Sequence, residues 1–178
     1  MRLLYRTRQF WLALGGRPKE SELALARQVL TPAQMALFAS MQPGEQVHAL
    51  QVLQRLLEQG ERHPDLLAAA LLHDCGKQLS PLSPLERAWI VLVQRLLPSR
   101  MEGWGQAERA DLGRLPAWRR PLVVAVQHPA WGAELARQAG ASALLQKLIG
   151  QHQQPPRGIP QNLEDELLVL LQAADNQT

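Results

Sequence analysis

The chain has little cysteine and no long apolar run. Cys75 is the single cysteine among 178 residues, so no disulfide can form within the chain and secretion gains no support. No apolar stretch approaches the ~20 residues that span a bilayer, so a transmembrane helix is not expected. No run of arginines is long enough to indicate a nucleic-acid polymer as partner. We therefore expect a cytoplasmic protein that binds neither a membrane nor a nucleic-acid polymer.

The composition is that of one globular domain. Hydrophobic residues make up 46% of the chain and charged residues 20%, which excludes a disordered protein. The formal net charge is +3, and 16 of the 19 basic residues are arginine. Guanidinium groups bind the oxygens of phosphate in a fork, so arginine usage is compatible with a phosphorylated ligand, although nucleotide bias or solubility explains it equally well.

Apolar residues recur at the helical period along nearly the whole chain, and nothing reads as a strand. The pattern predicts an all-α fold, a single compact helical bundle, with N-terminal helices in 1–43 packing on a domain formed by 44–178. The segment 2–14 predicts a short amphipathic helix that covers the core rather than a membrane surface or a signal peptide. Residues 99–119 lack periodicity and predict an irregular connection. The other helices are expected after Pro18, from Thr31–Pro32, over 44–59, 64–76, 83–97, 121–128, 129–138 and 142–153, and from Asn162 onward.

The most informative segment is Leu71-Leu72-His73-Asp74-Cys75-Gly76-Lys77. Residues 66–72 are apolar all round, so their helix should be buried. An imidazole and a carboxylate at the end of such a helix are costly unless a partner satisfies both, and a metal ion would do so. Further inward-facing donors lie one turn from apolar residues, at His48, His128, His152 and Asp175.

Two carboxylates and four imidazoles on inward faces favour a metal centre. A single buried histidine is more often a hydrogen-bonded core residue than a ligand. A structural role is harder to assign to Asp175. It lies near a helix C-terminus, where the helix dipole is negative, and no basic residue lies within one turn of it. Six mixed donors are too many for a structural zinc and suit two divalent ions of iron, manganese, cobalt or zinc. His63, in a turn beside Pro64, is expected to be solvated.

The order His48, His73-Asp74, Asp175, with small apolar residues before His-Asp-x-Gly-Lys, resembles the HD superfamily of metal-dependent phosphohydrolases. The resemblance covers residues from about 44 to 176. The later His128 and His152 resemble the HD-GYP branch of phosphodiesterases. However, Gln153 stands where that branch usually has a second histidine, and the Gly-Tyr-Pro element is missing. A third metal and a cyclic-dinucleotide specificity are therefore not implied.

The resemblance implies the chemistry of the site. His48, His73, Asp74, His128, His152 and Asp175 match the metal ligands, with Asp74 bridging two ions, and Lys77 matches the lysine that reaches the substrate phosphate. Water activated by the metal would attack phosphorus, so Asp74 and Lys77 are the predicted catalytic residues. The predicted partner is a small phosphate ester, with nucleotides among the candidates.

Several alternatives stay open from the sequence. The same ligand set can hold a di-iron pair that activates oxygen, or serve a non-catalytic module that senses a nucleotide or a metal. A helical interaction domain with histidines in its core is less favoured, because all six donors would then need other partners. Arg157 is a candidate phosphate contact and Trp131 a candidate stacking residue, although a surface arginine and a core or rim tryptophan are the favoured explanations. Cys75 is expected only to pack.

Overall fold

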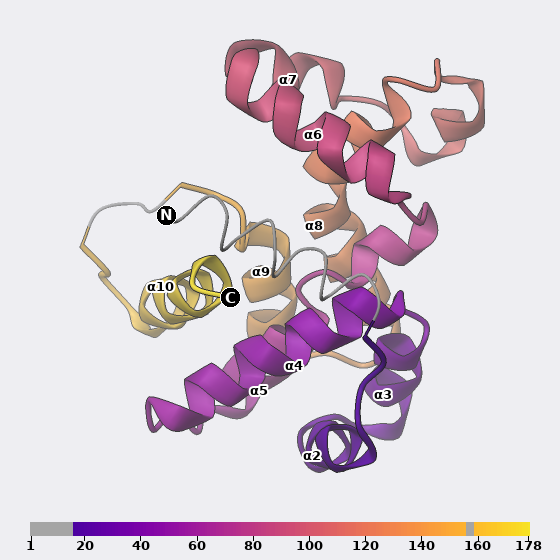
Figure 1. Ribbon diagram of the computed structural model, residues 1–178. Helices are drawn as coiled ribbons and strands as arrows, with labels where there is room; N and C mark the ends of the chain where they lie inside the picture. The colour runs from indigo at the N-terminus through magenta and orange to yellow at the C-terminus, as the bar shows by residue number, and fades with distance from the viewer. Residues whose placement is uncertain (1–15, 156–158) are drawn as a thin grey trace, which may run out of the picture.

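The computed structural model describes residues 16–155 and 159–178, and every regular element in these residues is a helix (Figure 1). The predicted helix over 2–14 and the candidate Arg157 lie outside the described residues. The all-α prediction is confirmed. The elements are α2 (Glu20–Val29), α3 (Pro32–Ala39), α4 (Pro43–Glu58), α5 (Pro64–Leu72), η1 (Cys75–Leu79), α6 (Pro84–Leu96), α7 (Pro98–Trp104), η2 (Arg109–Arg114), α8 (Arg120–Gln138), α9 (Ala143–Gln151) and α10 (Leu163–Asn176).

Proline and small polar residues set where the helices begin. Proline occupies the first position of α3, α4, α5, α6 and α7, where its missing N–H costs no hydrogen bond. The side chains of Thr31, Ser83, Ser142 and Asn162 accept hydrogen bonds from first-turn amides of α3, α6, α9 and α10. The starts predicted at Thr31–Pro32, Pro64, Ser83–Pro84 and Asn162 are therefore confirmed.

Helix α5 lies at the centre of the fold. Residues 66–72 are all buried, as their uniformly apolar sequence predicts, and α5 packs against α4, α9 and α10. Helices α2 and α3 also contact α5, and Ala26 and Phe38 belong to the same core cluster as Leu71. The boundary between 1–43 and 44–178 stays a prediction. This packing places the end of α5, and with it the His-Asp dipeptide, inside the bundle.

Helix α8 runs through a proline that the sequence analysis takes as a boundary. The prediction of separate helices over 121–128 and 129–138 is wrong, because Pro129 lies inside a continuous α8. Its consequence for His128 is described below. Helix α8 packs against α9 and against η1, so it lies beside the segment that follows the His-Asp dipeptide.

The predicted irregular connection at 99–119 contains two short helices, α7 and η2. The ring centroids of Trp104 and Trp118 lie 5.3 Å apart. The guanidinium of Arg119 donates to the carbonyl oxygens of Trp104 and Gln106. These contacts order a segment without helical periodicity and hold α7 on α8. Figure 1 shows α6 and α7 at one end of the molecule and α2 and α3 at the other. Within the described residues no helix has the length and apolarity needed to cross a membrane.

Candidate metal centre

The six predicted ligands converge where five helices meet. Their side chains come from the middle of α4, the end of α5, the middle of α8, the end of α9 and the end of α10. Ring centroids lie 5.3 Å apart for His48 and His73, 5.1 Å for His73 and His152, and 5.2 Å for His128 and His152. Residues spread over most of the chain therefore form one continuous cluster of imidazoles flanked by two carboxylates.

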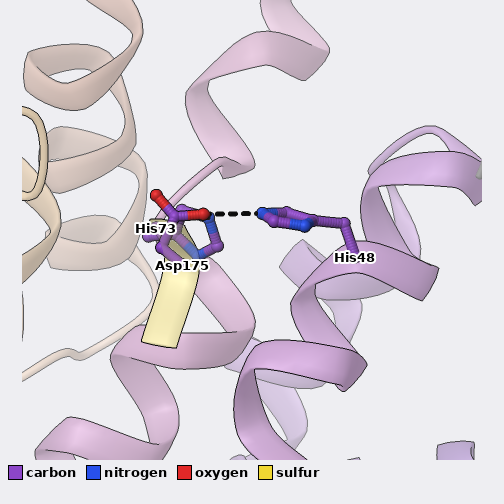
Figure 2. A group of neighbouring side chains, drawn as sticks. All are labelled: His48, His73 and Asp175. Carbon is purple, nitrogen blue, oxygen red and sulfur yellow. Dashed lines mark hydrogen bonds and ion pairs between the residues drawn. The ribbon is translucent and has the colours of Figure 1, made fainter. Parts of the chain in front are cut away.

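One half of the cluster is formed by His48, His73 and Asp175 (Figure 2). Each offers a donor atom within 4.8 Å of the other two. Nε2 of His48 lies 2.8 Å from Oδ1 of Asp175, and Nε2 of His73 lies 3.6 Å from the same oxygen. His48 and Asp175 keep 26% and 27% of their side chains exposed, so this half of the cluster faces solvent. Among the described residues the ion-pair partners of Asp175 are the imidazoles of His48 and His73, and its need for a cation stays a prediction.

The other half is formed by Asp74, His128 and His152, all buried. Oδ1 of Asp74 lies 3.2 Å from Nε2 of His128 and 3.7 Å from Nε2 of His152. The other carboxylate oxygen, Oδ2, lies 3.7 Å from Nε2 of His73. Asp74 thus faces histidines of both halves, one oxygen toward each, which is the position that a bridging carboxylate requires.

Backbone carbonyls fix the orientation of the three buried rings. Nδ1 of His73 lies 3.0 Å from the carbonyl oxygen of Ala70, and Nδ1 of His152 lies 2.8 Å from that of Ile149. A carbonyl oxygen can only accept, so each Nδ1 carries the proton and each Nε2 presents a lone pair. Nε2 of His73, His128 and His152 is buried without a hydrogen-bond partner. Three lone pairs that converge on carboxylates in a buried place fit a metal ion, which such ligands bind with the second nitrogen donating to the backbone.

Pro129 contributes to the orientation of His128. Nδ1 of His128 lies 3.0 Å from the carbonyl oxygens of both Val124 and Ala125. In a regular helix the carbonyl of Ala125 would accept from the amide of residue 129, but proline has no N–H to donate. The carbonyl of Ala125 is therefore left open to the imidazole. The proline that the sequence suggests as a helix end serves instead to secure a ligand ring.

The electrostatics keep the donors in the forms that bind metal. Burial lowers the pKa of His128 and lowers that of His152 to about 3, so both rings are neutral at pH 7. For Asp74, burial raises the pKa, but the positive charge of Lys77 is the largest influence that lowers it, and the pKa falls well below its ordinary 3.8. Burial likewise opposes ionisation of Asp175, yet the hydrogen bond from His48 brings its pKa to about 2. Neutral imidazole and ionised carboxylate are the ligating forms of these groups.

Lys77 lies beside the centre. Its Nζ atom donates to Oδ2 of Asp74 at 2.6 Å. Lys77 lies in η1, three residues after Asp74. The side chain keeps 20% of its surface exposed and borders two cavities described below. Its predicted contact with a substrate phosphate is untested and stays a prediction.

The remaining candidates differ in their surroundings. Cys75 is buried with its Sγ 3.6 Å from the carbonyl oxygen of Gly132, and burial raises the pKa of the thiol to about 12, in agreement with a packing role. His63 is half-buried and its Nδ1 is buried without a partner, so the expectation of a solvated ring is wrong. Trp131 is half-buried.

Three residues near the centre are not among the site residues predicted from the sequence. Glu45 is buried with 3% of its surface exposed, and it pairs with Arg87 of α6. Gln42, just before α4, accepts a hydrogen bond from the same arginine. Glu45 precedes His48 by three residues and so shares its helix face, which was the available sequence clue. The sequence around Arg87 gave no such clue, because its partner Glu45 lies on a helix that is distant in sequence.

A comparison with protein-family models assigns the chain. The model of the HD domain matches residues 46–177, about three quarters of the sequence. The chain belongs to the HD domain family. The resemblance found from His73-Asp74 is thereby confirmed for the family, whereas the HD-GYP-like branch stays a prediction. No curated protein and no solved structure matches the chain. HD domains are generally metal-dependent hydrolases, and the two groups of donors found here could hold the divalent metals that the family binds.

Proposed function

We propose that this HD domain protein hydrolyses a small phosphate ester, a nucleotide or a related monoester or diester, with two divalent transition-metal ions. The observation that carries the proposal is the set of buried Nε2 atoms on His73, His128 and His152, which have no hydrogen-bond partner and face two carboxylates. Leaving three acceptor atoms unpaired in a protein interior is costly, and a bound cation removes that cost.

The donor set divides between two ions. His48, His73 and Asp175 would hold one, and His128 and His152 the other, with Asp74 shared between them. Iron, manganese, cobalt and zinc all accept such mixed nitrogen and oxygen ligands. When bound, the ions supply a water nucleophile of lowered pKa and neutralise charge on the phosphoryl oxygens.

The chain's own residues prepare the reaction. The backbone carbonyls of α5, α8 and α9 hold three imidazoles in the ligating tautomer, so no reorientation is needed when a substrate arrives. Lys77 compensates the charge of Asp74, and its ammonium group, which borders the cavity, would approach a phosphate oxygen there. His48 and Asp175, which are part exposed, give the substrate access from the solvent side.

The experiment is a metal analysis of anaerobically purified protein, followed by a panel of phosphate esters. We expect about two divalent ions per chain and release of phosphate, or of a phosphomonoester from a diester. One ion per chain would remove His128 and His152 from the ligand set. A redox-active di-iron pair without esterase activity would instead indicate an HD-type oxygenase, and absence of metal would indicate a non-catalytic module.

A further inference from the structure

Two cavities flank the candidate metal centre. The first, of about 690 Å³, is bordered by His48, Asp74 and Asp175. The second, of about 580 Å³, is bordered by His128 and Pro129 on α8 and by α6. Each falls in the size range of small-molecule sites. A ligand bound in either space therefore lies beside residues of the metal centre.

The same two cations border both cavities. Among the described residues, Lys77 and Arg87 are the only lysine or arginine side chains in the lining of either one. The Arg87 side chain keeps 20% of its surface exposed, as the Lys77 side chain does. Lys77 comes from η1 and Arg87 from the first turns of α6, so separate elements bring two positive charges to the junction of the cavities. An anion at this junction would meet both.

The guanidinium of Arg87 is held on one side. Its Nη2 donates to Oε1 of Glu45 at 2.8 Å and to Oε1 of Gln42 at 2.6 Å, and its Nε lies 3.4 Å from the carbonyl oxygen of Leu82. Its Nη1 has no acceptor among the described residues. A guanidinium has donors on two edges, so the residues that fix one edge leave the other free for a ligand.

Glu45 explains how an arginine can stay fixed there. The carboxylate is buried, and its Oε2 has no hydrogen-bond partner, so Arg87 is its compensating charge. Such a pair adds little net potential to the cavity. What it adds is a donor in a fixed direction, which binds an oxyanion without the entropy cost of ordering a free side chain.

We propose that Arg87 is a second phosphate-binding residue, whose free Nη1 edge donates to a non-bridging oxygen of the ester that Lys77 also contacts. The inference rests on the proposed function for the identity of the anion. It assigns Gln42 and Glu45 as positioning residues that hold the guanidinium toward the cavities. Arg87 then acts on substrate affinity rather than on the metal ions, none of whose candidate ligands it contacts.

The test measures binding of inorganic phosphate to the metal-loaded full chain by calorimetry. Replacing Arg87 by Met should weaken phosphate binding about 10- to 100-fold, the worth of a charge-assisted hydrogen bond, while the metal content is unchanged. Arg120→Met is the matched control. Arg120 pairs with Glu86 at 2.6 Å, borders neither cavity, and should leave phosphate binding as in the wild type.

A second variant separates phosphate binding from a structural role. Arg87→Met leaves Glu45 buried without its cation, which could itself disturb the site. The double variant Glu45→Gln with Arg87→Met removes both charges together and so restores neutrality. We expect it to fold and to bind phosphate as weakly as Arg87→Met. Recovery of wild-type phosphate affinity in the double variant would overturn the proposal, because the only role of Arg87 would then be to neutralise the charge of Glu45.

The outcomes also distinguish this inference from the proposed function. If the metal-loaded wild type binds phosphate and Arg87→Met does not, Arg87 binds the anion even where no ester is hydrolysed. If the wild type hydrolyses esters while Arg87→Met keeps full phosphate affinity, the inference fails and the proposed function stands. A metal-loaded wild type that binds no phosphate overturns the assignment of Arg87.

Discussion

Nε2 of His128 lies 3.2 Å from Oδ1 of Asp74, and both atoms present lone pairs. The imidazole proton is held on Nδ1 by two carbonyl oxygens, so it is not available to join the pair. Two acceptors at this separation in a buried place repel each other unless a cation lies near both. This relationship is the local reason to expect metal at the end of α5.

Asp74→Ala should abolish metal binding and esterase activity while the helical circular dichroism spectrum stays largely intact. The carboxylate faces histidines of both halves of the cluster, so its loss removes a ligand from each ion. Metal per chain by mass spectrometry is the measurement. Asp111→Asn is the control, because Asp111 is a partly exposed carboxylate away from the centre and should keep full metal content. A metal-replete, active Asp74→Ala protein would refute the bridging role.

The metal-free protein should lose stability as the pH falls from about 6.5. In the fold, burial lowers the pKa of His128 and lowers that of His152 to about 3, while both titrate near 6.5 in the unfolded chain. Below pH 6.5 the unfolded chain binds more protons than the fold, so the free energy of unfolding decreases as the pH falls, by up to about 1.4 kcal/mol per pH unit for each histidine that stays neutral in the fold. The lowered pKa values of Asp74 and Asp175 act in the same direction below their ordinary 3.8.

The measurement is urea unfolding in chelator at several pH values between 5 and 7.5. His152→Gln should show a shallower dependence, because it removes one of the two histidines. A free energy of unfolding that stays constant over this range would contradict neutral, buried rings.

Gly76→Ala should destabilise the protein by at least ~2 kcal/mol. A Cβ atom at Gly76 would collide with the carbonyl oxygen of His128 and press on the amide nitrogen of Gly132. These are backbone atoms of α8 and cannot rotate away, so η1 would have to separate from α8. Thermal unfolding checks this against Gly113→Ala, where an added Cβ meets nothing within 4 Å. Equal melting temperatures for the two variants would show that the close approach is unimportant.

Pro129→Ala should have opposite effects on the fold and on the metal. The new amide would donate to the carbonyl of Ala125, which restores the helical hydrogen bond and stabilises α8. The same bond competes with Nδ1 of His128 and loosens the ring, so metal affinity should fall several-fold. A competition titration with a metal indicator and a thermal melt of the metal-free protein report the two effects separately. A rise in both the metal affinity and the melting temperature would contradict the role assigned to Pro129.

The inward orientation of the six candidate ligands could be predicted because each one carries a local pattern, whereas their role as metal ligands stays a prediction. His73 and Asp74 close a helix that is apolar all round, and His128 and His152 each follow an apolar residue by one turn. Such patterns give the inward face of a helix. That the faces meet at one point followed from the family resemblance, and the structure brings all six side chains together.

Other features depend on contacts that no local pattern contains. In the sequence, Pro129 indicates a helix end because it has no backbone N–H. Only the structure shows that the carbonyl of Ala125, which this proline leaves open, is used by the imidazole of His128. Order at 99–119 comes from Arg119 and from the contact of Trp104 with Trp118, not from periodicity. The pairing of Glu45 with Arg87 joins helices that are distant in sequence, so neither residue could be assigned before the fold was known.

The three buried imidazoles are oriented by hydrogen bonds to carbonyl oxygens of their own helices, three or four residues earlier in the chain. The orientation of these three rings is thus set mainly by helical backbone. Under the proposed function, changes in the residues of the two cavities other than the candidate ligands can alter which ester is accepted while these rings keep their orientation. Under the proposed function, the residues that recognise the substrate and those that bind the metal can therefore change independently during evolution.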